Sequence, residues 1–196
     1  MEENTANKPQ TDGNTGAGSF FGEIVKFTTL AIVIVAPIRW FVAQPFIVSG
    51  ASMYPTFDDA NYLIVDELSY YFREPARGEV VIFKYPNDTS KYFIKRVVGL
   101  PGETVDIDSG VVSIISDDGS VMTTLDESYV KYQSETSMRV VLRSNEYFVL
   151  GDNRAASSDS RMWGPVARNL IIGDVFVRLY PFNKIELHPG SATLTK

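Results

Sequence analysis

Short apolar runs separated by turn residues fill most of the chain after residue 50. The runs lie at 62–65, 80–83, 92–98, 111–115, 139–142, 147–150 and 171–180. Turn sequences such as Leu100-Pro101-Gly102 and Asp108-Ser109-Gly110 separate them, and no stretch sustains a helical period over three turns. Short strands between such turns are typical of a β-sandwich or barrel. We therefore predict a mainly β protein with an all-β domain over residues 45–196. Within that domain the less apolar residues 103–145 are expected to form added hairpins.

The N-terminal part has a different composition. Residues 1–19 are polar and rich in Asn, Thr and Gly, which predicts a disordered tail. The composition changes abruptly at Phe20, and residues 27–38 carry no charge. The tail and the apolar segment therefore form two separate regions ahead of the β domain.

Three interpretations compete for the apolar segment. A core helix is possible because the uncharged run is shorter than the ~20 residues that cross a bilayer. A cleaved signal peptide is disfavoured because the preceding region carries four acids against one lysine, Lys8, and the sequence around Pro45 is a poor cleavage site. We favour a single membrane anchor over residues 20–44, with Lys26 and Arg39 near the two interfaces and Trp40 at the headgroup level.

The charge and residue inventory excludes several classes of partner and cofactor. The net charge of −6 is unfavourable for binding nucleic acid. The chain has no cysteine, so it has neither disulfides nor thiolate metal sites, and its one histidine, His188, lies near the C-terminus. We therefore expect no nucleic-acid partner, no metal and no other cofactor.

Ser52 is the candidate nucleophile, since it lies between the flexible Gly50-Ala51 pair and a Met-Tyr-Pro-Thr turn. A serine needs a base within roughly 3 Å. With a single histidine in the chain, a lysine kept neutral by burial is the obvious alternative, and Lys95 has suitable surroundings. If residues 92–98 form a strand, Lys95 shares one face with Phe93 and Val97, and such apolar neighbours lower the pKa of an amine.

Each of these features also has an ordinary structural interpretation. A turn serine often bonds its own backbone, and most strand lysines are solvated. A third stretch, Gly151–Arg161, follows an apolar run and is crowded with charges and hydroxyls. It is either a solvated loop held by weak ion pairs or a rigid shelf that orients Lys95.

Together the three stretches resemble the type I signal peptidases, membrane-anchored serine proteases that use a Ser-Lys dyad. Ser49–Thr56 resembles the nucleophile box of that family, and Arg77–Val81 resembles a short strand box with Glu in place of the usual Asp. Tyr92–Gly102 resembles the lysine box, and Gly151–Gly164 resembles the last box. The resemblance runs from the apolar segment to about Val177, with the boxes in the order of the family.

The resemblance implies roles for individual residues. Ser52 would be the nucleophile, Lys95 the general base, and Ser157 would hold the lysine by a hydrogen bond. The Ser52 backbone N–H would bind the oxyanion, while Gly50 lacks the hydroxyl that many members carry at that position. The walls of the substrate pockets would be Phe46, Val48, Met53, Phe93 and Ile94, and the structural ion pairs would involve Arg96, Asp152, Asp159 and Arg161.

The resemblance also implies a function and a location. We expect a single-pass membrane endopeptidase that removes signal peptides from exported preproteins by cutting after Ala-x-Ala. Its N-terminus would lie in the cytoplasm and its catalytic domain on the outer face of the cell membrane. Two alternatives are a related Ser-Lys protease that processes itself or one dedicated partner, and a tethered β domain that binds extended peptides without cutting them.

Overall fold

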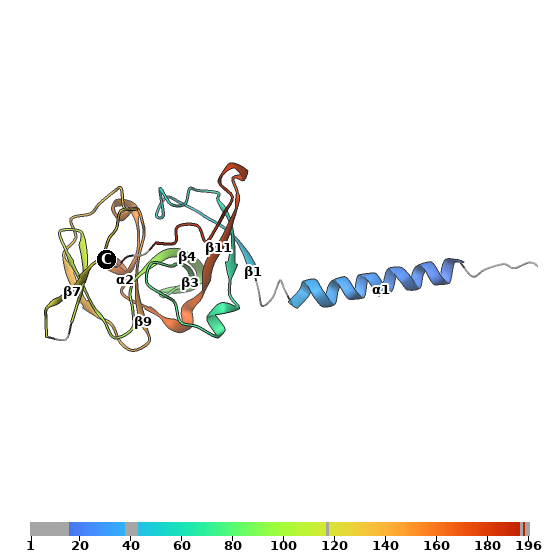
Figure 1. The fold of residues 1–196 in the computed structure, drawn as a ribbon, viewed down its shortest axis with the longest axis horizontal. Helices are drawn as coiled ribbons and strands as arrows, with labels where there is room; N and C mark the ends of the chain where they lie inside the picture. Colours follow the sequence, from blue (N-terminus) through green and yellow to red (C-terminus); the bar gives the residue numbers. More distant parts are fainter. Residues whose placement is uncertain (1–15, 38–42, 117, 193, 195–196) are drawn as a thin grey trace, which may run out of the picture. The chain divides into compact units, whose positions relative to one another are not determined.

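The structure, a computed structural model, describes residues 16–37, 43–116, 118–192 and 194 (Figure 1). The chain divides into two compact units, residues 1–40 and residues 41–196. The first unit contains helix α1 and the second contains the strands β1 to β12, from Ala43 to Leu187. The predicted mainly β domain is thus confirmed, and its boundary lies a few residues earlier than the predicted residue 45.

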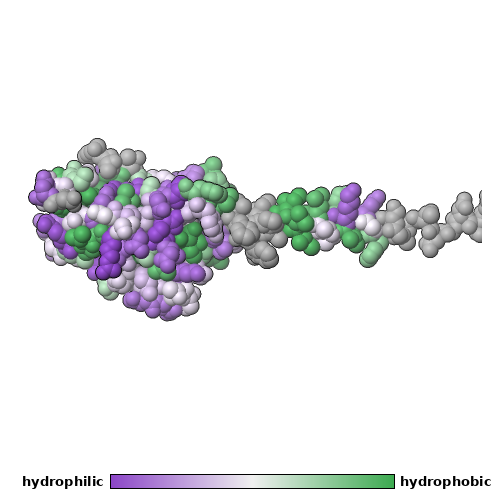
Figure 2. All heavy atoms as spheres, turned by 90° about the horizontal axis from the view of Figure 1, so that it is seen from below, coloured by the Kyte–Doolittle hydropathy of each residue, from purple (hydrophilic) through white to green (hydrophobic). Residues whose placement is uncertain are grey.

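Helix α1 occupies Gly16–Pro37. Its first four residues were predicted to belong to the polar tail, but helix growth adds one hydrogen bond per residue and needs no apolar period at its end. In Figure 2 hydrophobic side chains dominate the half of α1 nearer residue 37, while hydrophilic and hydrophobic side chains are mixed in its first half. Within the described ranges, no helix has both the length and the apolarity that a membrane crossing requires.

The predicted anchor, residues 20–44, differs from the structure at its C-terminal end. Strand β1 (Ala43–Ile47) already includes its last two residues. The reason is local, because the residue before Pro45 is biased toward extended backbone. The rest of the predicted tail, residues 1–15, and residues 38–42 lie outside the described residues.

The larger sheet of the second unit has eight strands within the described residues, in the order β1-β2-β11-β3-β4-β9-β10, with β12 paired to β11. All of these pairs are antiparallel. The strands are β2 (Tyr62–Asp66), β3 (Val80–Tyr85), β4 (Asp88–Gly99), β9 (Glu146–Leu150), β10 (Val166–Ala167), β11 (Ile171–Tyr180) and β12 (Glu186–Leu187).

The smaller sheet consists of β5 (Thr104–Asp108), β6 (Val111–Ile115), β7 (Val121–Thr124) and β8 (Met138–Val141), in the order β7-β6-β5-β8. It lies within the range 103–145 that was predicted to form added hairpins. One short helix, α2 (Ser160–Trp163), and 3₁₀ turns at Ser69–Tyr71, Arg154–Ala156, Arg168–Leu170 and Phe182–Lys184 complete the elements between the strands.

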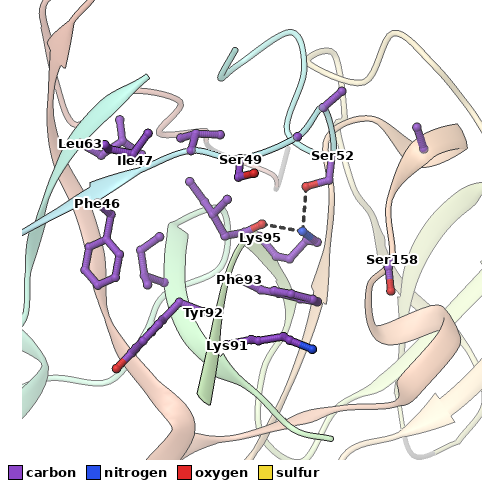
Figure 3. Close-up of a pocket in the computed structure, with 16 residues that line it drawn as sticks. Phe46, Ile47, Ser49, Ser52, Leu63, Lys91, Tyr92, Phe93, Lys95 and Ser158 are labelled. Atoms are coloured by element: carbon purple, nitrogen blue, oxygen red, sulfur yellow. Dashed lines mark hydrogen bonds between the residues drawn. The ribbon is translucent and has the colours of Figure 1, made fainter. Parts of the chain in front are cut away.

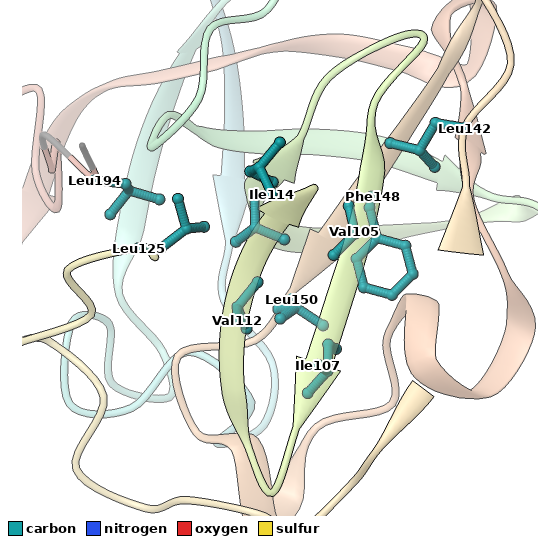
Figure 4. Close-up of a cluster of buried hydrophobic side chains, with 10 residues drawn as sticks. Val105, Ile107, Val112, Ile114, Leu125, Leu142, Phe148, Leu150 and Leu194 are labelled. Carbon is teal, nitrogen blue, oxygen red and sulfur yellow. The ribbon is translucent and has the colours of Figure 1, made fainter. Parts of the chain in front are cut away.

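Three clusters of buried apolar side chains hold the second unit together. One joins the smaller sheet to β9 through residues such as Val105, Ile114 and Phe148 (Figure 4). The other two lie on opposite faces of β3 and β4: Ile82 and Ile94 belong to one, and Val81 and Val97 to the other. Because both faces of β4 are covered, its second half is a rigid support for a functional side chain.

Candidate active site

The loop between β1 and β2 carries Ser52. Two backbone hydrogen bonds close its base: Val48 N–H donates to Asn61 O at 2.9 Å, and Ala60 N–H donates to Val48 O at 2.9 Å. Gly50 has φ +89°, a conformation that favours glycine, and its N–H donates to Asp59 Oδ1 at 2.7 Å. The turn geometry therefore explains the glycine two residues before Ser52.

Lys95 lies on β4 opposite Val81 of β3 and is only 4% exposed. Its Nζ lies 2.8 Å from Ser52 Oγ and 2.8 Å from Ile94 O (Figure 3). The same Nζ lies 5.3 Å from the centre of the Phe93 ring. The structure thus brings the two candidate catalytic side chains, 43 residues apart in sequence, into hydrogen-bond contact.

The surroundings of Lys95 favour its neutral form. Burial lowers its pKa from 10.5 to about 8, while the carboxylates of Asp159 and Asp152 act against this shift. Desolvation is the largest of these effects because removing an ammonium from water disfavours its charged form. A substantial fraction of the amine is therefore unprotonated at mildly alkaline pH.

A buried ion pair lies beside Lys95, the candidate base. Arg96 donates to Asp152 through Nε at 2.9 Å and through Nη2 at 2.6 Å, and both side chains are almost fully buried. The Arg96 guanidinium also donates to Gly78 O at 2.8 Å, and it lies 4.0 Å from the centre of the Tyr129 ring. On its other side, Asp152 accepts a hydrogen bond from Thr56 Oγ1. This pair therefore connects β4 to the loop that carries Ser52.

A second ion pair shapes the loop that follows β9. Arg161 donates to Asp159 through Nε and Nη2, each at 2.8 Å. Asp159 is fully buried and also accepts a hydrogen bond from Gly151 N–H at 3.1 Å. The structure thus pairs Arg96 with Asp152 and Asp159 with Arg161, and both pairs stabilise the backbone beside the site.

The structure does not show the hydrogen bond expected between Ser157 and Lys95. Among the described residues, the buried Ser157 hydroxyl has no hydrogen-bond partner. It lies against Gly151: a methyl group added there would be 2.1 Å from Ser157 Oγ and 2.5 Å from Ser52 O. Ser157 is therefore close to Ser52, but the Lys95 amine donates to Ser52 and to the backbone instead.

An open groove of about 540 Å³ leads to the pair. It is lined by Phe46 of β1, by Val48 just after β1, and by Phe93 and Ile94 of β4, which are four of the five residues predicted to form its walls. Figure 3 shows Phe46 and Phe93 at this groove. The fifth, Met53, is fully buried in the core cluster that contains Ile94. The prediction was wrong for Met53 because the turn after Ser52 folds back under the loop.

Sequence reasoning missed several residues near the site. Asn153 donates from its side chain to Ala51 O at 3.1 Å and from its backbone to Ser52 O at 3.0 Å. Arg154, the next residue, forms a buried ion pair with Glu127. Their position directly after Asp152 in a polar run is the one signal in the sequence that points to them, and it does not reveal their partners.

Comparisons with known proteins give a consistent result. A model of the signal peptidase family, peptidase S26, matches residues 21–180. Signal peptidase I of Leptolyngbya laminosa is 36% identical over 194 residues, which covers 94% of this chain and 89% of that protein. Signal peptidase I of Bacillus amyloliquefaciens is 33% identical over 174 residues, covering 82% and 86%. A crystal structure of a signal peptidase I from Enterococcus faecalis V583 is 27% identical, with a TM-score of 0.45, and the match covers 53% of this chain and 97% of that one.

Proposed function

Since the chain belongs to the type I signal peptidases, serine endopeptidases of the peptidase S26 family, we propose that it cuts preproteins with Ser52 as nucleophile and Lys95 as general base. The observation that carries this proposal is the 2.8 Å contact between Lys95 Nζ and Ser52 Oγ in a buried setting. An amine with a pKa of about 8 can accept the serine proton near neutral pH.

In the acylation step the Ser52 Oγ–H proton passes to the neutral Lys95 amine while Oγ bonds to the scissile carbonyl carbon. The carbonyl oxygen becomes an oxyanion, for which the Ser52 backbone N–H is the proposed donor. The tetrahedral intermediate collapses as the C–N bond breaks, and the Lys95 ammonium gives its proton to the leaving amine. The products of this step are an acyl-enzyme and the mature protein with a free N-terminus.

In the deacylation step Lys95 takes a proton from water, and the resulting hydroxide bonds to the acyl carbon. The second tetrahedral intermediate releases Ser52 Oγ, which recovers its proton from Lys95. The signal peptide leaves with a new carboxylate. One amine therefore serves as base and acid in both steps, and we expect that no metal or other cofactor takes part.

The groove supports recognition of an extended peptide with small side chains. Phe46 and Val48 on one side, and Phe93 and Ile94 on the other, offer apolar walls close to Ser52. A peptide strand between β1 and β4 would make backbone hydrogen bonds for affinity, while these walls would select small residues one and three positions before the cut. We propose cleavage after Ala-x-Ala on this basis.

Location is a further part of the proposal. The family resemblance leads us to propose that the segment preceding β1 attaches the enzyme to the cell membrane, with the N-terminus in the cytoplasm and the catalytic unit on the outer face. Protease added to intact spheroplasts should then digest residues 41–196 and leave an N-terminal fragment. Extraction by alkaline carbonate distinguishes a segment that spans the bilayer from one that lies on its surface.

The catalytic proposal is tested with the full chain in detergent and a model preprotein that carries Ala-x-Ala before its cut. Ser52→Ala and Lys95→Ala should each abolish cleavage, as read by mass spectrometry of the products. The matched controls Ser120→Ala and Lys131→Ala change an exposed serine and an exposed lysine far in sequence from the site and should cleave normally. Substantial turnover by either site variant, with the fold intact by circular dichroism, would contradict the dyad.

A further inference from the structure

In the peptide unit between Ala51 and Ser52, the carbonyl oxygen accepts two hydrogen bonds. Ala51 O accepts from Tyr54 N–H at 3.2 Å, which closes the turn after the nucleophile. It also accepts from Asn153 Nδ2 at 3.1 Å, a contact between residues 102 positions apart. One carbonyl oxygen thus uses both of its lone pairs, and the plane of its peptide unit is fixed from two directions.

The next peptide unit is held by the same residue. Asn153 N–H donates to Ser52 O at 3.0 Å. Asn153 is 8% exposed, and its side-chain Oδ1 accepts from Ala156 N–H at 3.3 Å, so the Nδ2 end of the amide faces Ala51. A single buried asparagine therefore contacts the carbonyls on both sides of the nucleophile.

Peptide geometry connects this contact to the chemistry. The Ala51–Ser52 bond is trans, so its C=O and N–H point in opposite directions. Since the C=O points toward Asn153, the N–H of Ser52 points away from it. In the described part of the chain, this N–H makes no hydrogen bond with the protein, and Ser52 lies at the wall of the groove while Asn153 does not line it. The N–H is thus free to donate a hydrogen bond to a substrate oxygen.

We propose that Asn153 is a positioning residue for the oxyanion: its side-chain amide fixes the Ala51–Ser52 peptide so that the Ser52 N–H points to where the substrate oxyanion forms. This inference rests on the proposed Ser52 chemistry. Hydrogen bonding to the carbonyl also polarises the peptide and strengthens its N–H as a donor. The role is particularly important in this chain because Gly50 cannot supply a hydroxyl for the same purpose.

Two variants of the full-length enzyme test the role. Asn153→Ala removes the side-chain amide without adding a charge. Asn153→Asp keeps the size of the side chain and the acceptor for Ala156 N–H but cannot donate to Ala51 O. Each is assayed on a model preprotein across a pH range, and kcat is compared on the alkaline plateau of each profile, where Lys95 is neutral in every variant.

Loss of an oxyanion donor lowers kcat by ~10²–10³, and a misdirected donor should cost less, so we expect kcat to fall about 10- to 100-fold in both variants. KM should stay within about threefold, and the midpoint of the Asn153→Ala profile should not move. A kcat within about twofold of the unmodified enzyme in either variant would overturn the proposal. So would a defect confined to KM.

A matched control separates positioning from stability. Thr56→Val removes a different hydrogen bond between the nucleophile loop and the segment after β9, the one to Asp152, and leaves the Ala51–Ser52 peptide untouched. Thr56→Val should lower the melting temperature by about as much as Asn153→Ala while losing much less kcat. Equal losses of kcat would assign Asn153 a structural role only and overturn the proposal. Activity in Ser52→Ala would instead refute the proposed catalysis itself, so the two failures are distinguishable.

Discussion

Replacing Lys95 with methionine should abolish cleavage and change how stability depends on pH. Folding lowers the pKa of the amine from 10.5 to about 8. Below pH 8 the amine is charged in both the folded and the unfolded protein. The folded protein is then destabilised by the full free energy needed to bury the ammonium. This cost disappears as the pH rises from 8 to 10.5, because the folded state releases its proton first.

The size of the effect follows from the shift. Each pKa unit corresponds to about 1.4 kcal/mol, so a lowering of some 2.5 units gives about 3 kcal/mol of destabilisation at neutral pH. Lys95→Met removes this destabilisation of the folded state entirely. It also removes the two hydrogen bonds to Ser52 and Ile94, and the part of their strength that changes when the amine loses its proton is already contained in its pKa. The difference between the two proteins as a function of pH therefore isolates the amine.

The assay is urea unfolding of the full chain and of Lys95→Met in the same detergent between about pH 7 and pH 10, followed by tryptophan fluorescence. The unmodified protein should gain about 2–3 kcal/mol relative to the variant over that range. In parallel, kcat of the unmodified enzyme should rise with pH and level off above about pH 8, because only the neutral amine can take the Ser52 proton. A stability difference that stays flat with pH would refute the reasoning, since it would mean that the Lys95 pKa is not lowered.

Three further perturbations follow from the contacts around the site. Arg96→Met leaves the buried Asp152 carboxylate unpaired and should destabilise the fold by about 3–5 kcal/mol in urea unfolding, with Arg139→Met, an exposed pair, as the control. Gly151→Ala places a methyl group 2.1 Å from Ser157 Oγ, so cleavage should fall at least about tenfold; an unchanged kcat would contradict that crowding. Phe148→Ala empties the core beneath the smaller sheet and should cost about 3–5 kcal/mol of stability without changing the pH midpoint of cleavage; a shifted midpoint would be inconsistent with its place opposite Gly99, at the end of β4.

The β architecture could be predicted from sequence because its signals are local. Apolar runs and turn residues determine where strands begin and end, and the runs at 80–83 and 147–150 became β3 and β9. The strand alternation around Lys95 was similarly local: Val97 belongs to one core cluster, and Phe93 packs against the same cluster. Met53 is the counterexample, because its place in the core depends on how the loop after Ser52 folds back.

Contacts between loops could not be predicted in the same way. The hydroxyl of Ser157 lies close to Ser52, yet the Lys95 amine is satisfied by Ser52 and Ile94 O. The amide of Asn153 reaches Ala51 O only because two loops pack against each other. No periodicity encodes such contacts, since they depend on backbone positions set by the whole sheet.

The arrangement of these contacts explains how a strand and a loop can hold two side chains at a fixed distance. Lys95 and Arg96 are neighbours on β4 with side chains on opposite faces, and Arg96 holds Asp152. Asp152 accepts from Thr56, and the next residue, Asn153, holds the backbone of Ser52. The contacts thus form a closed path from Lys95 through Arg96, Asp152 and the nucleophile loop back to Lys95. Arg96 is the most heavily bonded link, with buried hydrogen bonds to both Asp152 and Gly78 O, so a change at Arg96 should alter the geometry of Lys95 and Ser52 although it touches neither Ser52 nor the substrate. The Thr56 hydroxyl contributes one hydrogen bond to the path, and its loss leaves the contacts of Asn153 with Ala51 O and Ser52 O in place.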